Sequence, residues 1–161
     1  MSWSRRSVIL AALALAACGF SPVYGPEGVG GKLFGQVRTA DPKTPDDFSF
    51  AGRIAERLGP DSNPRFELGY RLRIAVVPQA ITPDEITTRY ALNGSADFVL
   101  TEQASGKVVT RGQVSSFTSY STTGTTIATM AAEQDAHERL ARMLADQVVT
   151  RLMAVDPAAV P

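Results

Sequence analysis

The stretch Tyr70-Arg-Leu-Arg-Ile-Ala-Val76 alternates apolar side chains with arginine and alanine, and Pro78 bounds it. Successive side chains of a β-strand point to opposite faces of a sheet, so this period of two predicts a strand. We expect one face to be buried and the other to meet water, as antiparallel sheets allow. The expected buried side chains are Tyr70, Leu72, Ile74 and Val76.

Two segments that follow show the same alternation. One runs from about Arg89 to Thr101, and the other from Val108 to about Tyr120, after a turn at Ser105-Gly106. Together the three segments predict the main part of an antiparallel sheet. In the segment at 89–101 the expected buried face is Tyr90, Leu92, Ala96, Phe98 and Leu100. In the segment at 108–120 it is Val108, Val114 and Tyr120.

A helix is predicted ahead of these strands. Thr44 can accept hydrogen bonds from free backbone amides, Pro45 suits the first helical position, and Asp47 stands where a capping-box acid belongs. Gly59-Pro60 ends the segment. The apolar face that we expect consists of Phe48, Ala51, Ala55 and Leu58.

A longer amphipathic helix is predicted from about Thr126 to Ala154, with Thr125 or Thr126 as its N-cap. Asp156-Pro157 ends it. Apolar residues that recur every four positions should form its buried stripe, because they lie on one side of the helix. They are Leu140, Leu144, Val148 and Leu152.

The first part of the domain is less regular. Lys32-Leu-Phe-Gly-Gln-Val37 is a short strand candidate that Gly35 interrupts. The order of elements is then strand, helix, three strands, helix. We therefore predict the α+β class: a two-layer sandwich in which two helices pack on one face of a four-stranded, mostly antiparallel sheet. The other face of the sheet should remain polar and partly open.

The start of the chain has the pattern of an export signal, with Arg5-Arg6 ahead of an apolar run at residues 8–17. The run is too short to span a bilayer, which takes about 20 apolar residues. Leu15-Ala-Ala-Cys18 resembles the bacterial lipobox, in which the cysteine is joined to diacylglycerol and becomes the first residue. The alternative is that Cys18 is a small buried hydrophobe. The paired arginines leave open whether export is by the general or the twin-arginine route.

The chain therefore divides into a lipoprotein signal peptide at residues 1–17, a flexible tether rich in Gly and Pro at 18–31, an α+β domain at 32–156 and a tail at 157–161. Loss of the signal removes two of the 16 basic side chains and leaves the 16 acidic ones. This weakly acidic balance argues against nucleic acid as a partner. A single cysteine excludes an internal disulfide.

Candidate catalytic groups are scarce. His137 is the only histidine and lies in the predicted C-terminal helix, where a solvated or half-buried structural position is the simpler interpretation. No second histidine or cysteine stands near it in the sequence to complete a zinc site. The hydroxyl-rich run at residues 115–126 lacks the small-residue elbow of a nucleophilic serine. We predict that the protein is not an enzyme and has no cofactor or metal.

Four arginines, Arg71, Arg73, Arg89 and Arg111, fall on the polar faces of the predicted strands. Guanidinium groups bind phosphate in a bidentate geometry, which makes these residues candidate contacts with a phosphate group. The alternative is a solvated strand face whose charges discourage edge pairing.

Several short motifs occur in a characteristic order. They are Cys18-Gly-Phe-Ser-Pro-Val-Tyr-Gly25, Thr88-Arg-Tyr-Ala-Leu-Asn93, Ser119-Tyr-Ser121, and Ala131-Ala-Glu-Gln-Asp-Ala136 followed by Arg139-Leu-Ala141. In this order, after a lipobox, they resemble the LptE family of lipopolysaccharide-assembly lipoproteins, in its alphaproteobacterial form. The resemblance covers nearly all of the chain that follows the signal.

This resemblance implies a lipid-anchored protein on the periplasmic face of the outer membrane, which plugs and helps assemble the LptD β-barrel in lipopolysaccharide transport to the cell surface. Gly19 fits that address, because an aspartate after the lipidated cysteine is the usual signal for retention in the inner membrane. The alternative is an accessory lipoprotein of an envelope lipid-transport ATPase complex.

One feature departs from the family pattern. The family's contacts with lipopolysaccharide are attributed to basic residues in the loop between the second and third strands, whereas residues 79–87 here are acidic at Asp84 and Glu85. The resemblance therefore supports the plug function better than the lipid contact. If phosphates are bound, Arg89 just after this loop is the nearest candidate, with Arg71, Arg73 and Arg111 behind it.

Overall fold

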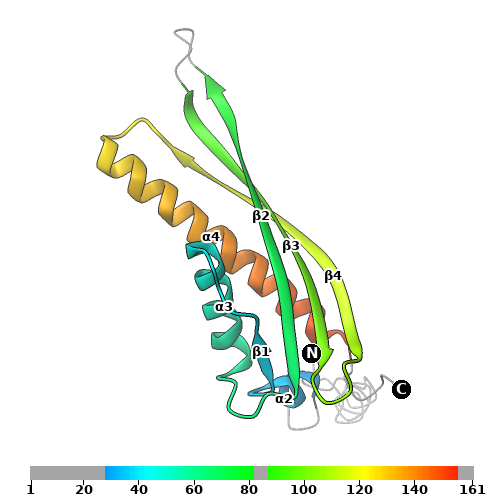
Figure 1. Ribbon diagram of the computed structural model, residues 1–161. Helices are drawn as coiled ribbons and strands as arrows, with labels where there is room; N and C mark the ends of the chain where they lie inside the picture. The colour runs from blue at the N-terminus through cyan, green and yellow to red at the C-terminus, as the bar shows by residue number, and fades with distance from the viewer. Residues whose placement is uncertain (1–27, 82–86, 156–161) are drawn as a thin grey trace, which may run out of the picture.

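The computed structural model describes residues 28–81 and 87–155. The predicted signal peptide, Cys18 and the acidic pair Asp84 and Glu85 lie outside the described residues, as does Asp156-Pro157. The elements, labelled as in Figure 1, are α2 (Val29–Leu33), β1 (Val37–Thr39), α3 (Pro45–Leu58), β2 (Phe66–Ile81), β3 (Thr87–Glu102), β4 (Val108–Ser121) and α4 (Thr126–Met153).

The four strands form one sheet in the order β1-β2-β3-β4. β1 runs parallel to β2, and the other neighbours are antiparallel. α3 and α4 lie on the same side of the sheet, and the hairpin of β2 and β3 extends beyond the layer of helices (Figure 1). The predicted α+β sandwich and its mostly antiparallel sheet are therefore confirmed.

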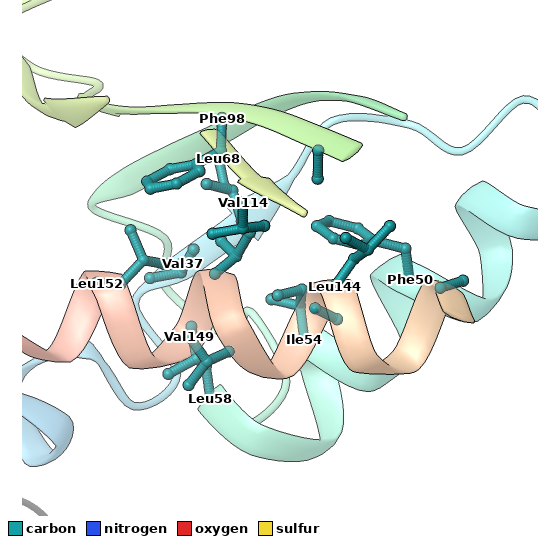
Figure 2. Packing of buried hydrophobic residues seen from close by; sticks show 14 of the residues in the cluster. Val37, Phe50, Ile54, Leu58, Leu68, Phe98, Val114, Leu144, Val149 and Leu152 are labelled. Atoms are coloured by element: carbon teal, nitrogen blue, oxygen red, sulfur yellow. The ribbon is translucent and has the colours of Figure 1, made fainter. Parts of the chain in front are cut away.

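The core lies between the sheet and the helices, as Figure 2 shows. The predicted stripe of α4 is confirmed, because Leu140, Leu144, Val148 and Leu152 are all buried. The strands and α3 supply the facing side chains. Those labelled in Figure 2 are Val37, Phe50, Ile54, Leu58, Leu68, Phe98 and Val114.

Gly94 in β3 allows α4 to approach the sheet closely. A Cβ atom at this position would lie 2.9 Å from Cδ2 of Leu140 and 3.1 Å from Cδ1 of Leu144. Any larger residue would push against these two buried leucines, so the distance between the layers depends on the absence of a side chain here.

The predicted caps of both long helices are confirmed. The Thr44 side chain accepts a hydrogen bond from the Asp47 amide, and the Asp47 carboxylate accepts one from the Thr44 amide, which completes a capping box. Thr125, rather than Thr126, caps α4 by accepting from the amide of Ala128. These caps explain why both helices begin where the sequence predicts.

The first strand was placed wrongly. Residues 29–33 form the short helix α2, with Leu33 fully buried, and β1 comprises only Val37–Thr39. Gly35 lies between them with a positive φ of 68°, so the chain turns where the sequence prediction continued a strand. The helix also crosses the predicted boundary between tether and domain.

The apolar face predicted for α3 is right at Leu58, which is buried, but wrong at Phe48, which is 63% exposed, and at Ala55, which is exposed. Ala51 is half-buried, and the other buried residues of this helix are Phe50 and Ile54. Two apolar stripes compete on this helix. The one with the larger side chains meets α4 and the sheet, since it removes more apolar area from water.

Two strand positions also differ from the alternation. Val76 is 47% exposed although its cross-strand partner Leu92 is fully buried, because Val76 lies on β2 past the end of β1, at the edge of the sheet. Val108 is exposed, because the pairing of β3 with β4 shifts register at this end, and Val109 packs against the core in its place.

Candidate partner-binding surface

The helices leave one face of the sheet uncovered, and cross-strand pairing brings three of the four candidate arginines together there. Asp97 in β3 lies between Arg71 of β2 and Gln113 of β4. Arg73 is two residues from Arg71 on the same face, and Arg111 is two residues from Gln113. Arg71, Arg73 and Arg111 thus form an arginine cluster around one carboxylate.

The cluster keeps a positive charge. Asp97 forms an ion pair with Arg73, and its other oxygen accepts a hydrogen bond from Nε2 of Gln113 at 2.7 Å. Arg71, Arg73 and Arg111 are all exposed. The cluster has three guanidinium groups and one carboxylate, so a guanidinium group of this surface can bind an anion in bidentate geometry.

Arg89 is not part of this cluster. Arg89 pairs with Ser121 of β4. It lies six residues along β3 from Ser95, which is the cross-strand partner of Arg73. At about 3.3 Å per residue this places it about 20 Å away, toward the tip of the hairpin. The four candidate residues therefore make one cluster and one separate cation.

An apolar patch adjoins the arginine cluster. Phe117 of β4 is 72% exposed and pairs with Asn93, which in turn pairs with Ala75 of β2. Val77 is exposed on the same face one cross-strand row further along. The sequence alternation already put Phe117 on the wet face. A large aromatic residue among serines at such a position is a signal for a binding surface that the sequence carries.

A pocket of about 470 Å³ lies on the other side of β2, between its edge and the start of α3. Its lining includes Asp41, Asp46, Asp47 and Tyr70 together with the cations Lys43 and Arg71. The Tyr70 hydroxyl is buried and has no hydrogen-bond partner within the described part of the chain. Its burial, together with the nearby charges of Asp47 and Asp41, raises the pKa of Tyr70 to about 12.

His137 has a structural position. It is half-buried on α4, and its Nδ1 lies 3.1 Å from both carboxylate oxygens of Asp46 on α3. The hydroxyl-rich run divides into the end of β4, a bend and the Thr125 cap. Across residues 28–81 and 87–155, no three His, Cys, Asp or Glu side chains are grouped to hold a metal ion.

This fold, with an uncovered sheet face that is part cationic and part apolar, defines the class of a binding module. The sequence matches the LptE family, described as lipopolysaccharide-assembly, over residues 36–152, and the chain belongs to this family. Its general role is therefore in lipopolysaccharide assembly. No helix in the described residues is both long and apolar enough to cross a bilayer.

Solved structures of lipoproteins share the fold. One from Caulobacter crescentus CB15 has a TM-score of 0.65 at 20% identity and covers 78% of this chain and 93% of its own. Rare lipoprotein B from Shewanella oneidensis gives 0.54 at 12% identity, with coverages of 74% and 92%. Lipoprotein B from Nitrosomonas europaea gives 0.57 at 9% identity, with coverages of 75% and 83%. No curated protein matches the sequence significantly.

Proposed function

We propose that this chain is an outer-membrane lipoprotein that plugs and helps assemble an LptD-like β-barrel, through which lipopolysaccharide reaches the cell surface. The observation that carries the proposal is membership of the LptE family over most of the domain. The protein would act by binding rather than by catalysis, with no cofactor.

The uncovered sheet face is the surface that we assign to this function. The lumen of an outer-membrane barrel is polar, and a plug needs a polar face that tolerates water and hydrogen-bonds to the wall. The serines of β4 and the arginine cluster supply such groups. The same guanidinium groups are suited to the phosphates of lipopolysaccharide, which makes them candidate contacts for either partner.

The membrane anchor is part of the proposal. Cys18 would carry the lipid, and Gly19 would leave the protein free to reach the outer membrane rather than remain in the inner one. Acyl chains on one residue hold a domain firmly when two or more insert together. The anchor would then hold the domain at the periplasmic face of the outer membrane, close enough to enter the barrel that it plugs.

The test combines depletion with affinity purification from detergent-solubilised envelopes. We expect a large β-barrel to co-purify with the protein, and we expect that barrel to be lost when the protein is depleted. If depletion left barrel assembly and surface lipopolysaccharide unchanged, the proposal would be wrong. Recovery of inner-membrane permease and ATPase components instead would support an accessory lipoprotein of a lipid-transport complex.

A set of arginine variants tests the surface. Arg71→Ala, Arg73→Ala and Arg111→Ala combined should reduce the recovered barrel about tenfold, because an interface arginine often contributes more than about 1 kcal/mol. Arg142→Ala is the matched control, since Arg142 is exposed on α4 and pairs with Glu138 there. Equal recovery with both variants would show that the partner binds elsewhere.

A further inference from the structure

Strand β4 forms one edge of the sheet, because it is last in the strand order and pairs only with β3 in the described residues. The amide of Thr122, just after β4, donates to the carbonyl of Thr88 in β3. Since neighbours along a strand direct their backbone groups to opposite sides, the odd-numbered residues of β4 direct theirs outward. Such a row of amides and carbonyls can pair with a strand of another chain. Within the described residues, no backbone hydrogen bond reaches the outer side of Gln113, Ser115, Phe117 or Ser119.

The sequence of β4 has none of the usual protections of an edge strand against such pairing. Natural edge strands often carry charged side chains, prolines or bulges. Between Gly112 and Ser121, β4 contains no charged residue and no proline, and its register with β3 is regular. The edge of β2 beyond β1, by contrast, contains Arg71, Arg73 and Pro78. Whatever protects the edge of β4 therefore lies elsewhere in the molecule.

Two side chains of α4 reach the outer edge of β4. Nε2 of Gln147 donates to the carbonyl of Ser115 at 3.1 Å, and Nη2 of Arg139 donates to the carbonyl of Ser119 at 3.3 Å. Arg139 is held there by the hydroxyl of the buried Thr118, which accepts from Nε at 3.1 Å and from Nη2 at 2.7 Å. Side-chain donors thus occupy two carbonyls of the edge.

The spacing of the two contacts fits the helix to the strand. Arg139 and Gln147 are eight residues apart, which is about 12 Å along a helix that rises 1.5 Å per residue. Ser115 and Ser119 are four residues apart, or about 13 Å along a strand. One row of α4 with a step of four residues therefore follows the edge of β4 in the opposite direction. Met143, the middle residue of this row, has no donor to offer.

We propose that Arg139 and Gln147 close the edge of β4 to strand addition, and that two copies of the chain pair through β4 when these donors are lost. The two side chains occupy carbonyls that an added strand would need, and their donor groups lie where that strand would run. In this way α4 protects the edge without adding a further strand, which would expose a new edge. The proposal does not rest on the proposed function.

A second copy is the partner that best fits the unprotected edge. Antiparallel pairing of β4 with β4 about a two-fold axis is self-complementary, since the same residues face one another from both sides. A register centred on Ser116 pairs Arg111, the only charged residue of β4, with Ser121 of the other copy, so like charges do not meet. The two Phe117 rings, each 72% exposed, would become diagonal neighbours and cover one another.

Hydrogen exchange by NMR on the full chain in excess detergent, at two protein concentrations about tenfold apart, tests the proposal. Arg139→Met with Gln147→Met removes both donors and keeps side chains of similar length. The amides of Gln113 and Phe117 should then exchange about tenfold more slowly at the higher concentration, because pairing protects them. In the wild type their exchange should be the same at both concentrations. Unchanged exchange in the double variant would overturn the proposal, and so would concentration-dependent protection in the wild type.

Matched variants separate the lost donors from other effects. Arg139→Lys keeps a charge and a donor and should match the wild type. Arg142→Met with Thr150→Met adds the same two side chains at exposed positions that bond within α4, and should leave the exchange of β4 unchanged. Protection of Gln113 and Phe117 in this control would mean that added apolar surface causes the pairing, and the proposal would be wrong.

A single variant keeps the test decisive if the double variant does not fold. Gln147→Met leaves the contacts of Arg139 with Thr118 intact and opens the edge at Ser115. The amide of Gln113 should exchange about threefold more slowly at the higher concentration, a smaller change than in the double variant because one carbonyl remains occupied. Exchange that did not depend on concentration would show that Gln147 does not close the edge.

Discussion

Gly94 sets the distance between the two layers of the protein. Gly94→Ala would place a methyl group within about 3 Å of Leu140 and Leu144, both fully buried. We expect a loss of about 1–3 kcal/mol in the free energy of unfolding, as is typical of overpacked cores. Urea denaturation followed by circular dichroism measures it. Gly69→Ala is the control, because the nearest atom to its Cβ is 3.9 Å away. Equal losses in both variants would contradict the steric explanation.

Removal of the Tyr70 hydroxyl should increase the stability of the folded protein. It is buried without a hydrogen-bond partner among the described residues, so Tyr70→Phe should raise the free energy of unfolding by about 1 kcal/mol at neutral pH. The aromatic contact with Phe50, at 4.6 Å between ring centroids, would remain. A destabilised variant would mean that the hydroxyl has a partner after all.

The same tyrosine predicts a pH dependence. Its pKa is raised from 10.0 to about 12, so above about pH 10 the unfolded chain loses a proton that the folded protein still holds. The free energy of unfolding should therefore fall as pH rises from about 10 to about 12. Tyr70→Phe should show a shallower decline over this window. Identical pH profiles for the two proteins, measured by urea denaturation, would refute this assignment.

Among the elements, α3 depends most clearly on its capping box. Thr44→Ala removes the side-chain acceptor of the Asp47 amide and should cost about 1 kcal/mol of stability. Thr44→Ser keeps the hydroxyl and should recover most of the loss. Thermal or urea denaturation of both variants provides the comparison. If serine were no better than alanine, the cap would not be the source of the effect.

The elements that could be predicted from the sequence are those with a local cause. Caps at Thr44 and Thr125 and the period of two in β3 act within a few residues, and the structure confirms them. The exposure of Phe48 depends on which face of α3 meets α4, and that of Val76 depends on β1 ending after three residues. Such long-range contacts cannot be predicted from the spacing of apolar and polar residues within one segment.

At the scale of the whole molecule, the arginine cluster could be predicted in part. Alternation alone assigned Arg71, Arg73 and Arg111 to wet faces, but only the register of β2, β3 and β4 brings them around Asp97 and leaves Arg89 apart. The free edge of β2 was not predictable, because it depends on β1 ending after three residues. The arginine cluster is therefore a product of strand pairing.

The lipid anchor and the folded domain should be separable. Under the proposed function, Cys18→Ser removes the site of lipidation and should leave intact the buried cluster that, among the described residues, begins at Leu33. We expect the variant to leave the membrane fraction while its thermal unfolding midpoint stays that of the wild type. Ala17→Gly, which keeps both the cysteine and a small residue at the cleavage site, should remain with the membrane. A Cys18→Ser protein that failed to fold would show that the cysteine is part of the core, and one that stayed in the membrane would show that another feature holds the protein there.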